Sequence, residues 1–352
     1  MSTPARAASL SALPVPLDTS PMEARLADEL PSGAGWQFEP KWDGFRCLAF
    51  RAGDHVELRA KSGKSLSRYF PEVIEALRAV KSTVFVVDGE LAVPVGSSLS
   101  FDALQMRLHP AASRIRRLSR ETPAIFVLFD CLLSTTRVSL LDEPLEHRRE
   151  ALEGLYGAWP RSLFRLTPFT RDRRQARRWL QSARGALDGV VAKRVDGPYR
   201  PGERDMVKVK CLRTADCVVG GFRYASGKPV VGSLLLGLYD SAGKLNHVGF
   251  TSAIPTAEKP ALTRKLEKLR SPPGFTGDAP GGPSRWSTER SAEWEPLKPR
   301  LVAEVQYDHV TAGRFRHGTR FVRWRPDKAP AQCTCDQMQP ELRPGRLLGL
   351  LR

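Results

Sequence analysis

The sequence has no long apolar segment. No run approaches the length that is needed to span a bilayer, and the N-terminus, MSTPARAASLSALPVPLD, lacks the continuous apolar core of a signal peptide. We therefore expect no membrane association and predict a cytoplasmic protein. Residues 1–20 are expected to form a flexible lead-in.

Cysteine is also scarce. The six cysteines lie at positions 47, 131, 211, 217, 333 and 335, and only the last two are close together. One intervening residue is the wrong spacing for a zinc knuckle. This pattern predicts reduced, mostly structural thiols.

Acidic residues are too few to balance the basic ones. The chain has 55 Lys and Arg against 38 Asp and Glu, which gives a net charge of +17. Such a surplus causes self-repulsion unless a polyanion shares the surface. Nucleic acid is the first candidate for that polyanion, and an anionic membrane is the second. The alternative explanation of the positive charge is a genome that uses arginine often, which would imply no anionic partner.

Short runs rich in Val, Phe and Leu predict strands. They cover residues 84–88, 125–133, 190–195, 206–210, 217–222, 233–240, 300–308 and 321–325. Helical periodicity predicts helices over residues 71–80, 172–185 and 256–270. The strands do not alternate regularly with helices, so we expect an α+β domain followed by a small β-rich domain.

A domain boundary is predicted near residues 211–217. Up to Arg213 the chain has 34 Lys and Arg against 25 Asp and Glu, and the shorter remainder has 21 against 13. The C-terminal part is therefore the more basic for its size. Residues 271–291 are rich in Pro, Gly and Ser, which predicts a long surface loop.

The stretch EPKWDGFR (39–46) is interpreted as one short turn that crowds a lysine, a carboxylate, a glycine and an arginine together. An amine is nucleophilic only when neutral, and burial or nearby cations lower its pKa from about 10.4. Downstream, MVKVK places Lys208 and Lys210 on one face of a strand. If that face is directed toward Lys41, the three amines repel one another, and Lys41 can lose its proton near neutral pH. The same cations would bind phosphate. A half-exposed strand edge is the alternative.

Carboxylates accompany two Asp-Gly pairs. VVDGEL ends a strand with Asp88 and Glu90, and LDGVVAKR places Asp188 before a strand that carries Lys193. Acidic residues at strand ends can bind Mg²⁺ through oxygen, or ribose hydroxyls. Each pair alone is typical of a turn. Together with Asp43-Gly44 there are three such pairs, two of them near a lysine, and this number weakens that interpretation.

These stretches form an ordered series that resembles the covalent nucleotidyltransferases. KWDG (41–44) is similar to the KxDG motif of ATP-dependent DNA ligases, RNA ligases and mRNA capping enzymes. The family's later motifs are matched, in order, by DGE (88–90), the Phe-Asp of FVLFD (126–130), DGVVAKR (188–194), MVKVK (206–210) and RFVRWRPDK (320–328). YFPE, SFDALQMRLHP (100–110) and LRTADCVVGGF (212–222) make the chain most similar to the stand-alone bacterial ATP-dependent DNA ligases, which are related to the ligase domain of the bacterial end-joining ligase.

The resemblance implies a role for each matching residue of the nucleotide site. Lys41 would carry the nucleotide covalently. Glu39 would meet the adenine edge and Phe129 would stack on the adenine ring. Arg46 would contact phosphate, and Glu90 would bind ribose or organise a metal.

Further residues would surround the phosphates. Asp188, where many relatives have glutamate, would help to hold the metal, and Lys208 and Lys210 would hold the α-phosphate. Lys61, where many relatives have arginine, would contact phosphate or DNA. Lysine keeps the positive charge of arginine but lacks its planar, two-pronged guanidinium group. Two more ATP-binding residues are expected at Lys193 and Arg204. On the C-terminal domain, the residues that would engage the leaving pyrophosphate are Arg320, Arg323, Arg325, Asp327 and Lys328.

The resemblance implies an α+β fold. We expect an ATP-grasp-like covalent nucleotidyltransferase domain with antiparallel sheets (21–213) and a small OB-fold β-barrel domain (214–352). The expected activity is ATP-dependent sealing of 5′-phosphate/3′-hydroxyl nicks in DNA repair, with Mg²⁺ or Mn²⁺ as cofactor. The partners would be nicked double-stranded DNA of the nucleoid and the Ku end-binding protein, and the enzyme would be a monomer.

Two alternatives remain on sequence grounds. One is an RNA ligase or capping-type guanylyltransferase on the same fold. The other is a basic DNA-binding OB protein with an inactive nucleotide site, against which the intact motif series argues.

Overall fold

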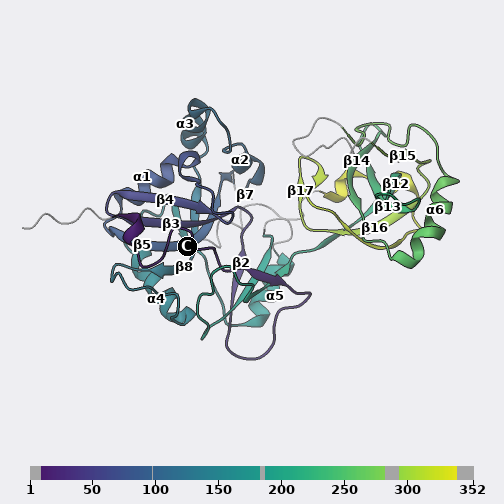
Figure 1. Ribbon diagram of the computed structural model, residues 1–352. Coiled ribbons are helices and arrows are strands. Elements are labelled where there is room, and N and C mark those ends of the chain that lie inside the picture. The colour runs from purple at the N-terminus through teal and green to yellow at the C-terminus, as the bar shows by residue number, and fades with distance from the viewer. Residues whose placement is uncertain (1–8, 97, 183–186, 282–292, 339–352) are drawn as a thin grey trace, which may run out of the picture. The chain divides into compact units, whose positions relative to one another are not determined.

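The computed structural model describes residues 9–96, 98–182, 187–281 and 293–338 (Figure 1). Over these residues the chain divides into two units, and the division falls between Cys211 and Leu212. No helix in the described ranges is both long and apolar enough to cross a membrane.

A five-stranded sheet forms the centre of the first unit. Its order is β4-β3-β5-β8-β9, with β3 (Phe45–Ala52), β4 (His55–Ala60), β5 (Val84–Ala92), β8 (Ile125–Leu133) and β9 (Phe164–Leu166). Figure 1 shows β3, β4, β5 and β8 side by side. Every residue of β8 is buried, so this sheet is covered on both faces.

A second, four-stranded sheet has the order β1-β11-β10-β2. It consists of β1 (Ala24–Leu26), β2 (Trp36–Lys41), β10 (Gly189–Arg194) and β11 (Met206–Lys210). The pair β1 and β11 is parallel, as is the pair β8 and β9 of the first sheet. Both sheets are therefore mixed, which corrects the expectation of antiparallel sheets.

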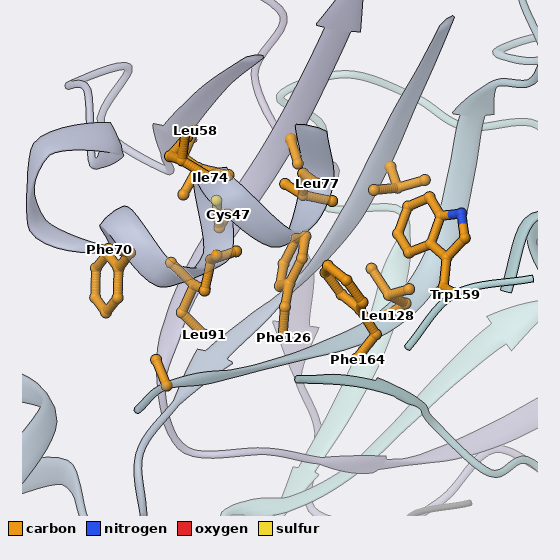
Figure 2. Packing of buried hydrophobic residues seen from close by; sticks show 14 of the residues in the cluster. Cys47, Leu58, Phe70, Ile74, Leu77, Leu91, Phe126, Leu128, Trp159 and Phe164 are labelled. Atoms are coloured by element: carbon orange, nitrogen blue, oxygen red, sulfur yellow. The ribbon is translucent and has the colours of Figure 1, made fainter. Parts of the chain in front are cut away.

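Helices cover the outer faces of these sheets. They are α1 (Pro71–Ala79), α2 (Phe101–Gln105), α3 (Ala112–Glu121), α4 (Leu145–Tyr156) and α5 (Arg173–Ser182). Figure 2 shows the core on one face of the five-stranded sheet, where Cys47, Phe126 and Leu128 meet Ile74 and Leu77 of α1. Short elements complete the unit: η1 (Leu10–Ala12), η2 (Ser67–Tyr69) and the pair β6 (Pro94–Val95) and β7 (Ser98–Leu99).

The opposite face of the five-stranded sheet packs toward the second sheet. Leu48 and Phe50 of β3 share a buried cluster with Met206 of β11. Residues 47 and 48 thus point to opposite faces, as the period of two in a strand requires. Val15 is fully buried in the same cluster. The described part of the predicted flexible lead-in, residues 9–20, is therefore packed against the sheet.

The second unit is a β domain. Its sheet has the order β14-β13-β12-β16-β19, with β15 on β12. The strands are β12 (Arg213–Tyr224), β13 (Val231–Tyr239), β14 (Leu245–Thr251), β15 (Glu295–Pro296), β16 (Val302–Tyr307) and β19 (Arg320–Trp324). Around them lie the hairpin β17 (Val310–Thr311) and β18 (Arg314–Phe315), helix α6 (Lys259–Glu267), η3 (Thr256–Glu258), η5 (Pro330–Gln332) and η6 (Cys335–Met338).

The expected barrel is not closed by ladders of hydrogen bonds within the described residues. Among these residues, the two edges of the sheet are joined by one isolated bridge, between Thr251 and Thr319. The unit nevertheless has its own core, in which Val218, Leu236 and Val305 are completely buried. The C-terminal β domain that we expected is therefore present, but its sheet is open along this seam.

All of the predicted strands and helices are present. The helix predicted over residues 172–185 is described to Ser182, and residues 183–186 lie outside the described chain. Residues 271–281 contain neither helix nor strand, as predicted for the loop, and the rest of that loop again lies outside the described residues.

One buried arginine stabilises the first unit, and we predict a large cost for its loss. The guanidinium of Arg107 is completely buried and donates to both oxygens of Glu72, at 2.7 and 2.8 Å, and to the carbonyl of Tyr69. Arg107→Ala leaves that carboxylate without its partner and should lower the free energy of unfolding by about 3–5 kcal/mol. Arg117→Ala, which breaks an exposed pair with Glu121, should cost under about 1 kcal/mol. Urea unfolding of both variants is the measurement, and equal costs would contradict the prediction.

Candidate active site

The strand register brings the candidate nucleophile beside a carboxylate. Lys41 is the last residue of β2, and Gly189 at the start of β10 pairs with Lys41 on one side and with Lys210 of β11 on the other. The amide of Asp188 donates to the carbonyl of Lys41 at 3.0 Å. A Cβ at position 189 would collide with the carbonyl of Val209, so this close alignment requires glycine.

The side chains of Lys41 and Asp188 form an ion pair between Nζ and Oδ2. The Asp188 carboxylate is 7% exposed, whereas the lysine side chain is 27% exposed. The cation is therefore held from the protein interior and remains accessible from outside.

Lys41 lines a cavity of about 180 Å³. The predicted site residues that line it are Glu39, Lys41, Arg46, Lys61, Glu90, Phe129, Lys193 and Lys208. They come from β2, β10 and β11 of one sheet and from β3, β5 and β8 of the other, or, for Lys61, from the turn after β4. Residues that are up to 169 positions apart in the sequence thus share one site.

A β-bulge directs Phe129 into this cavity. On β8, Asp130 pairs with Asp88 and Leu128 pairs with the next residue, Gly89, so that Phe129 is the extra residue. A bulge re-aims a side chain that regular alternation would direct elsewhere. The Phe129 ring is 9% exposed and lines the cavity.

Arg46 is bound from behind by a second carboxylate. Its Nε and Nη2 donate to the two oxygens of Asp88, each at 2.6 Å, and the hydroxyl of Tyr199 donates to the same carboxylate at 2.6 Å. The Arg46 guanidinium carbon lies 4.5 Å from the centre of the Phe129 ring. Arg46, which was expected to contact phosphate, therefore already supports the wall of the cavity.

A buried network supports the other side. Lys193 is 3% exposed, and its Nζ pairs with Glu39 at 2.9 Å and donates to the carbonyl of Phe129 at 3.2 Å. The second oxygen of Glu39 accepts a hydrogen bond from Gln37 at 2.9 Å. Burial alone would raise the pKa of Asp130, but the charges of its neighbours Arg148 and Lys193 hold it below its ordinary value. These contacts fix the orientation of Glu39 and the position of the bulge.

The carboxylate of Glu90 is available to bind a ligand. It lies opposite Arg46 in the register of β3 and β5 and lines the cavity, and no hydrogen bond or ion pair joins its carboxylate to another described residue. Burial raises its pKa to about 7, although Lys41 and Arg46 oppose the shift. Close to neutral pH, Glu90 can therefore change its charge.

The expected crowding of amines is visible at Lys208. Its pKa is lowered first by burial and then by the charges of Lys41, Lys210 and Lys61. Burial alternates along β11, where Lys208 and Lys210 are partly exposed and Val209 between them is buried. The two lysines thus lie on one face, as their spacing predicted.

Lys61 lines the cavity and Arg204 is not among its lining residues, but both cations contact the same carboxylate. Lys61 pairs with Glu23 at 2.9 Å and is 60% exposed. Arg204 lies 3.6 Å from the same carboxylate and is 75% exposed. Glu23 lines the cavity, and sequence reasoning missed it, because nothing marks an isolated glutamate as the partner of cations far along the chain.

The structure does not place the C-terminal candidates among the residues that line this cavity. They belong to the second unit, on β19 and the turn that follows it, at Arg320, Arg323, Arg325, Asp327 and Lys328. Arg323 pairs with Glu304 of β16 at 2.7 Å. A further carboxylate, Asp216, contacts two of the five and was not singled out from the sequence.

A divalent cation is compatible with the carboxylates of the first unit. Asp188 and Glu90 supply hard oxygen donors, and Glu90 has no other partner among the described residues. No cluster of three or more His, Cys, Asp or Glu side chains suited to a metal occurs within the described ranges. Mg²⁺ commonly uses one or two carboxylates together with substrate phosphates and water, so two carboxylates fit this mode of binding.

Family models match both units. Residues 21–210 match the ATP dependent DNA ligase domain, and residues 227–328 match the ATP dependent DNA ligase C terminal region. The chain has the fold of a Lig E DNA ligase whose structure covers 86% of this chain and 99% of its own, with a TM-score of 0.53 at 18% identity.

Curated relatives agree with the family models. The chain is 44% identical over 343 residues to DNA ligase C1 of Mycolicibacterium smegmatis, covering 94% of this chain and 96% of that protein. It is 41% identical over 347 residues to DNA ligase C of Mycobacterium tuberculosis, with the same coverage. It is 31% identical over 310 residues to the multifunctional non-homologous end joining DNA repair protein LigD of Mycobacterium tuberculosis, covering 84% of this chain and 37% of LigD.

These matches extend over both units and include the residues that line the cavity as well as the C-terminal motif. They favour a DNA ligase over an RNA ligase, a capping-type guanylyltransferase or an inactive DNA-binding protein. The chain belongs to the ATP-dependent DNA ligases.

Proposed function

We propose that this ligase seals 5′-phosphate/3′-hydroxyl nicks in double-stranded DNA through a covalent Lys41-AMP intermediate. The observation that carries the proposal is the position of Lys41. Its amine is held by Asp188 at the edge of a cavity whose wall combines an aromatic ring with several cations. That combination suits a nucleotide with a charged triphosphate.

In the first step, the neutral amine of Lys41 attacks the α-phosphorus of ATP. The phosphorus–nitrogen bond forms, the bond from the α-phosphorus to the bridging oxygen breaks, and pyrophosphate leaves with that oxygen. The ammonium proton of Lys41 must be lost before the attack, because only the neutral amine is a nucleophile. The step is an in-line phosphoryl transfer, so alignment and positive charge supply most of the catalysis.

The cavity residues divide into nucleotide contacts and supports. Phe129 would stack on adenine and Glu39 would meet its edge, while Lys208 and Lys210 would hold the α-phosphate. Lys193 lies between Glu39 and Phe129, so we assign it a positioning role instead of a direct contact with ATP. Nη1 of Arg46 does not donate to Asp88, so this nitrogen could donate a hydrogen bond to phosphate.

Mg²⁺ or Mn²⁺, bound by Asp188 and Glu90, would neutralise charge on the phosphates. Glu90 could instead accept a hydrogen bond from a ribose hydroxyl, and its raised pKa makes either role depend on pH. Lys61 and Arg204 both contact the carboxylate of Glu23, and a phosphate of DNA or ATP could replace that carboxylate as their partner.

Two further steps would complete the reaction. An oxygen of the 5′-phosphate attacks the AMP phosphorus and Lys41 leaves. The 3′-hydroxyl then attacks the 5′-phosphorus, and AMP departs as the phosphodiester forms. The net charge of +17 would strengthen binding to DNA through counterion release. A role in DNA repair is supported by the similarity to LigD.

The setting of the enzyme remains a prediction. A cytoplasmic, nucleoid-associated monomer agrees with the six free cysteines, since thiols stay reduced in that compartment. Joining of free DNA ends would require a bridging partner, for which Ku is the expected candidate.

Replacement of the nucleophile tests the proposed intermediate. Lys41→Ala should form no covalent adenylate with α-radiolabelled ATP and should not seal a nicked duplex, because no other amine is held at this position. Lys81→Ala, at an exposed position of the same unit, should behave as the wild type. An acid-labile label that persists on Lys41→Ala would refute the assignment.

The raised pKa of Glu90 predicts a dependence of stability on pH. The folded protein holds this proton up to about pH 7, whereas an unfolded glutamate releases it near its ordinary value of 4.5. The contribution of Glu90 to stability is thus complete below about pH 4.5 and declines as the pH rises to about 7. The glutamine of Glu90→Gln cannot ionise. The melting temperature of this variant, relative to that of the wild type at the same pH, should therefore increase between pH 5 and 8.

Thermal unfolding without nucleotide at several pH values measures this difference. Glu75→Gln, an exposed position on α1, is the control and should follow the wild type throughout. Parallel curves for Glu90→Gln and the wild type would contradict the prediction.

The C-terminal motif should act only while pyrophosphate is present. Lys328→Ala or Arg325→Ala should lose self-adenylation by roughly 10²-fold or more, the scale for removal of a group that stabilises developing charge. Both variants should still seal a nick whose 5′ end already carries AMP, since no pyrophosphate leaves in that reaction. The two rates should be measured side by side, with Lys298→Ala, at an exposed position of the same unit, as the control. Equal losses on both substrates would make the segment a DNA contact.

A further inference from the structure

A single carboxylate holds two cations of the C-terminal motif. Asp216 Oδ1 accepts a hydrogen bond from Arg325 Nη1 at 2.9 Å, and its Oδ2 contacts Lys328 Nζ at 2.7 Å. Asp216 lies on β12, more than 100 residues before the motif. Two cations three residues apart repel each other, and a shared carboxylate offsets that repulsion.

Asp216 is itself fixed by its surroundings. The residue is 8% exposed, and its amide donates to Gln337 Oε1 at 2.9 Å. Gln337 Nε2 donates back to the Asp216 carbonyl at 3.1 Å. On the motif side, the Arg325 amide donates to the carbonyl of Val302 at 2.8 Å. The carboxylate and the start of the turn are therefore anchored to the same sheet.

The two cations differ in how many donors remain. Arg325 uses Nη1 on Asp216 and uses both Nε, at 3.0 Å, and Nη2, at 2.8 Å, on Asp327. Lys328 donates to Asp216, and its side chain is 27% exposed. An ammonium has three donors, so Lys328 retains capacity for an anion.

From this geometry we infer that Asp216 is a positioning residue of the adenylation step. It holds Arg325 as a support and presents the Lys328 ammonium to the anionic leaving group. This assignment rests on the proposed function, in which the motif engages pyrophosphate. Asp216 takes no part in the chemistry and acts through Lys328.

The substitution Asp216→Asn tests the assignment, because it keeps the shape and removes the charge. We expect the rate of Lys41 adenylation to fall roughly 10- to 100-fold, the effect of losing a hydrogen bond to a charged group. The reverse reaction, in which pyrophosphate removes AMP from the adenylated enzyme, should fall by a similar factor. Sealing of a pre-adenylated nick should stay within about twofold of the wild type, the resolution of such rate comparisons. The control Asp278→Asn makes the same charge change at an exposed position of the unit and should leave all three rates unchanged.

A double-mutant cycle separates positioning from general support. If Asp216 acts through Lys328, the variant that combines Asp216→Asn with Lys328→Ala should adenylate no more slowly than Lys328→Ala alone. Additive losses would mean that Asp216 acts elsewhere. If Asp216→Asn does not fold, Asp216→Glu keeps the charge on a longer side chain, and it should show a smaller loss confined to adenylation.

Several results would overturn the inference. Equal losses in adenylation and in sealing of the pre-adenylated nick would assign Asp216 to the fold alone. Unchanged adenylation would remove the positioning role, and faster adenylation would make Asp216 a competitor of pyrophosphate for the two cations. Failure of the proposed function would appear separately, as labelling of Lys41→Ala.

Discussion

The pairing of cations with buried carboxylates is the interaction on which the rest of the candidate active site depends. The cavity gathers positive side chains that are partly desolvated, and unpaired buried charges are strongly destabilising. Asp188 pairs with Lys41 and Glu39 pairs with Lys193, and in both pairs the carboxylate is the more deeply buried partner. Lys41 is thereby held at the cavity, whereas Lys193 is held within its wall, where it contacts Glu39 and the carbonyl of Phe129. The charges of the candidate site are thus stabilised by the protein itself.

Close backbone approach is the second requirement. The strands β3 and β5 bring Arg46 opposite Glu90, and a side chain on Gly44 would collide with the carbonyl of Leu91 and with Glu90 itself. The glycine of the KWDG motif therefore has a steric reason that is independent of the nucleotide. It allows the side chain of Glu90 and the turn that follows Lys41 to lie close together. The cavity geometry follows from the packing of the backbone before any ligand enters.

Much of this arrangement could be predicted, and the remainder shows what a sequence leaves open. Period-two patterns identified β11 and the common face of Lys208 and Lys210, because alternation is a local property. EPKWDGFR was interpreted as one short turn, yet its first residues end β2 and its last begin β3, since charged residues in strands hide the apolar alternation. The bulge at Phe129 depends on how β8 pairs with β5, so the sequence of β8 alone does not predict it. Glu23 and Asp216 were missed for the same reason: their partners are distant in sequence.

The difference between arginine and lysine gives the C-terminal motif its internal division of labour. In the sequence, Arg325 and Lys328 are two equivalent positive charges. In the structure, the planar fork of Arg325 spans Asp216 and Asp327, which leaves it little freedom, and the attraction of Asp327 contributes to the rise in its pKa. A compact ammonium can contact one carboxylate and still turn two donors outward. A rigid cation that is bonded on two sides is suited to hold the segment, and a cation with free donors is suited to meet a phosphate that arrives and departs. The carboxylates around a basic motif, and not its charge alone, therefore determine which cation can act on the substrate.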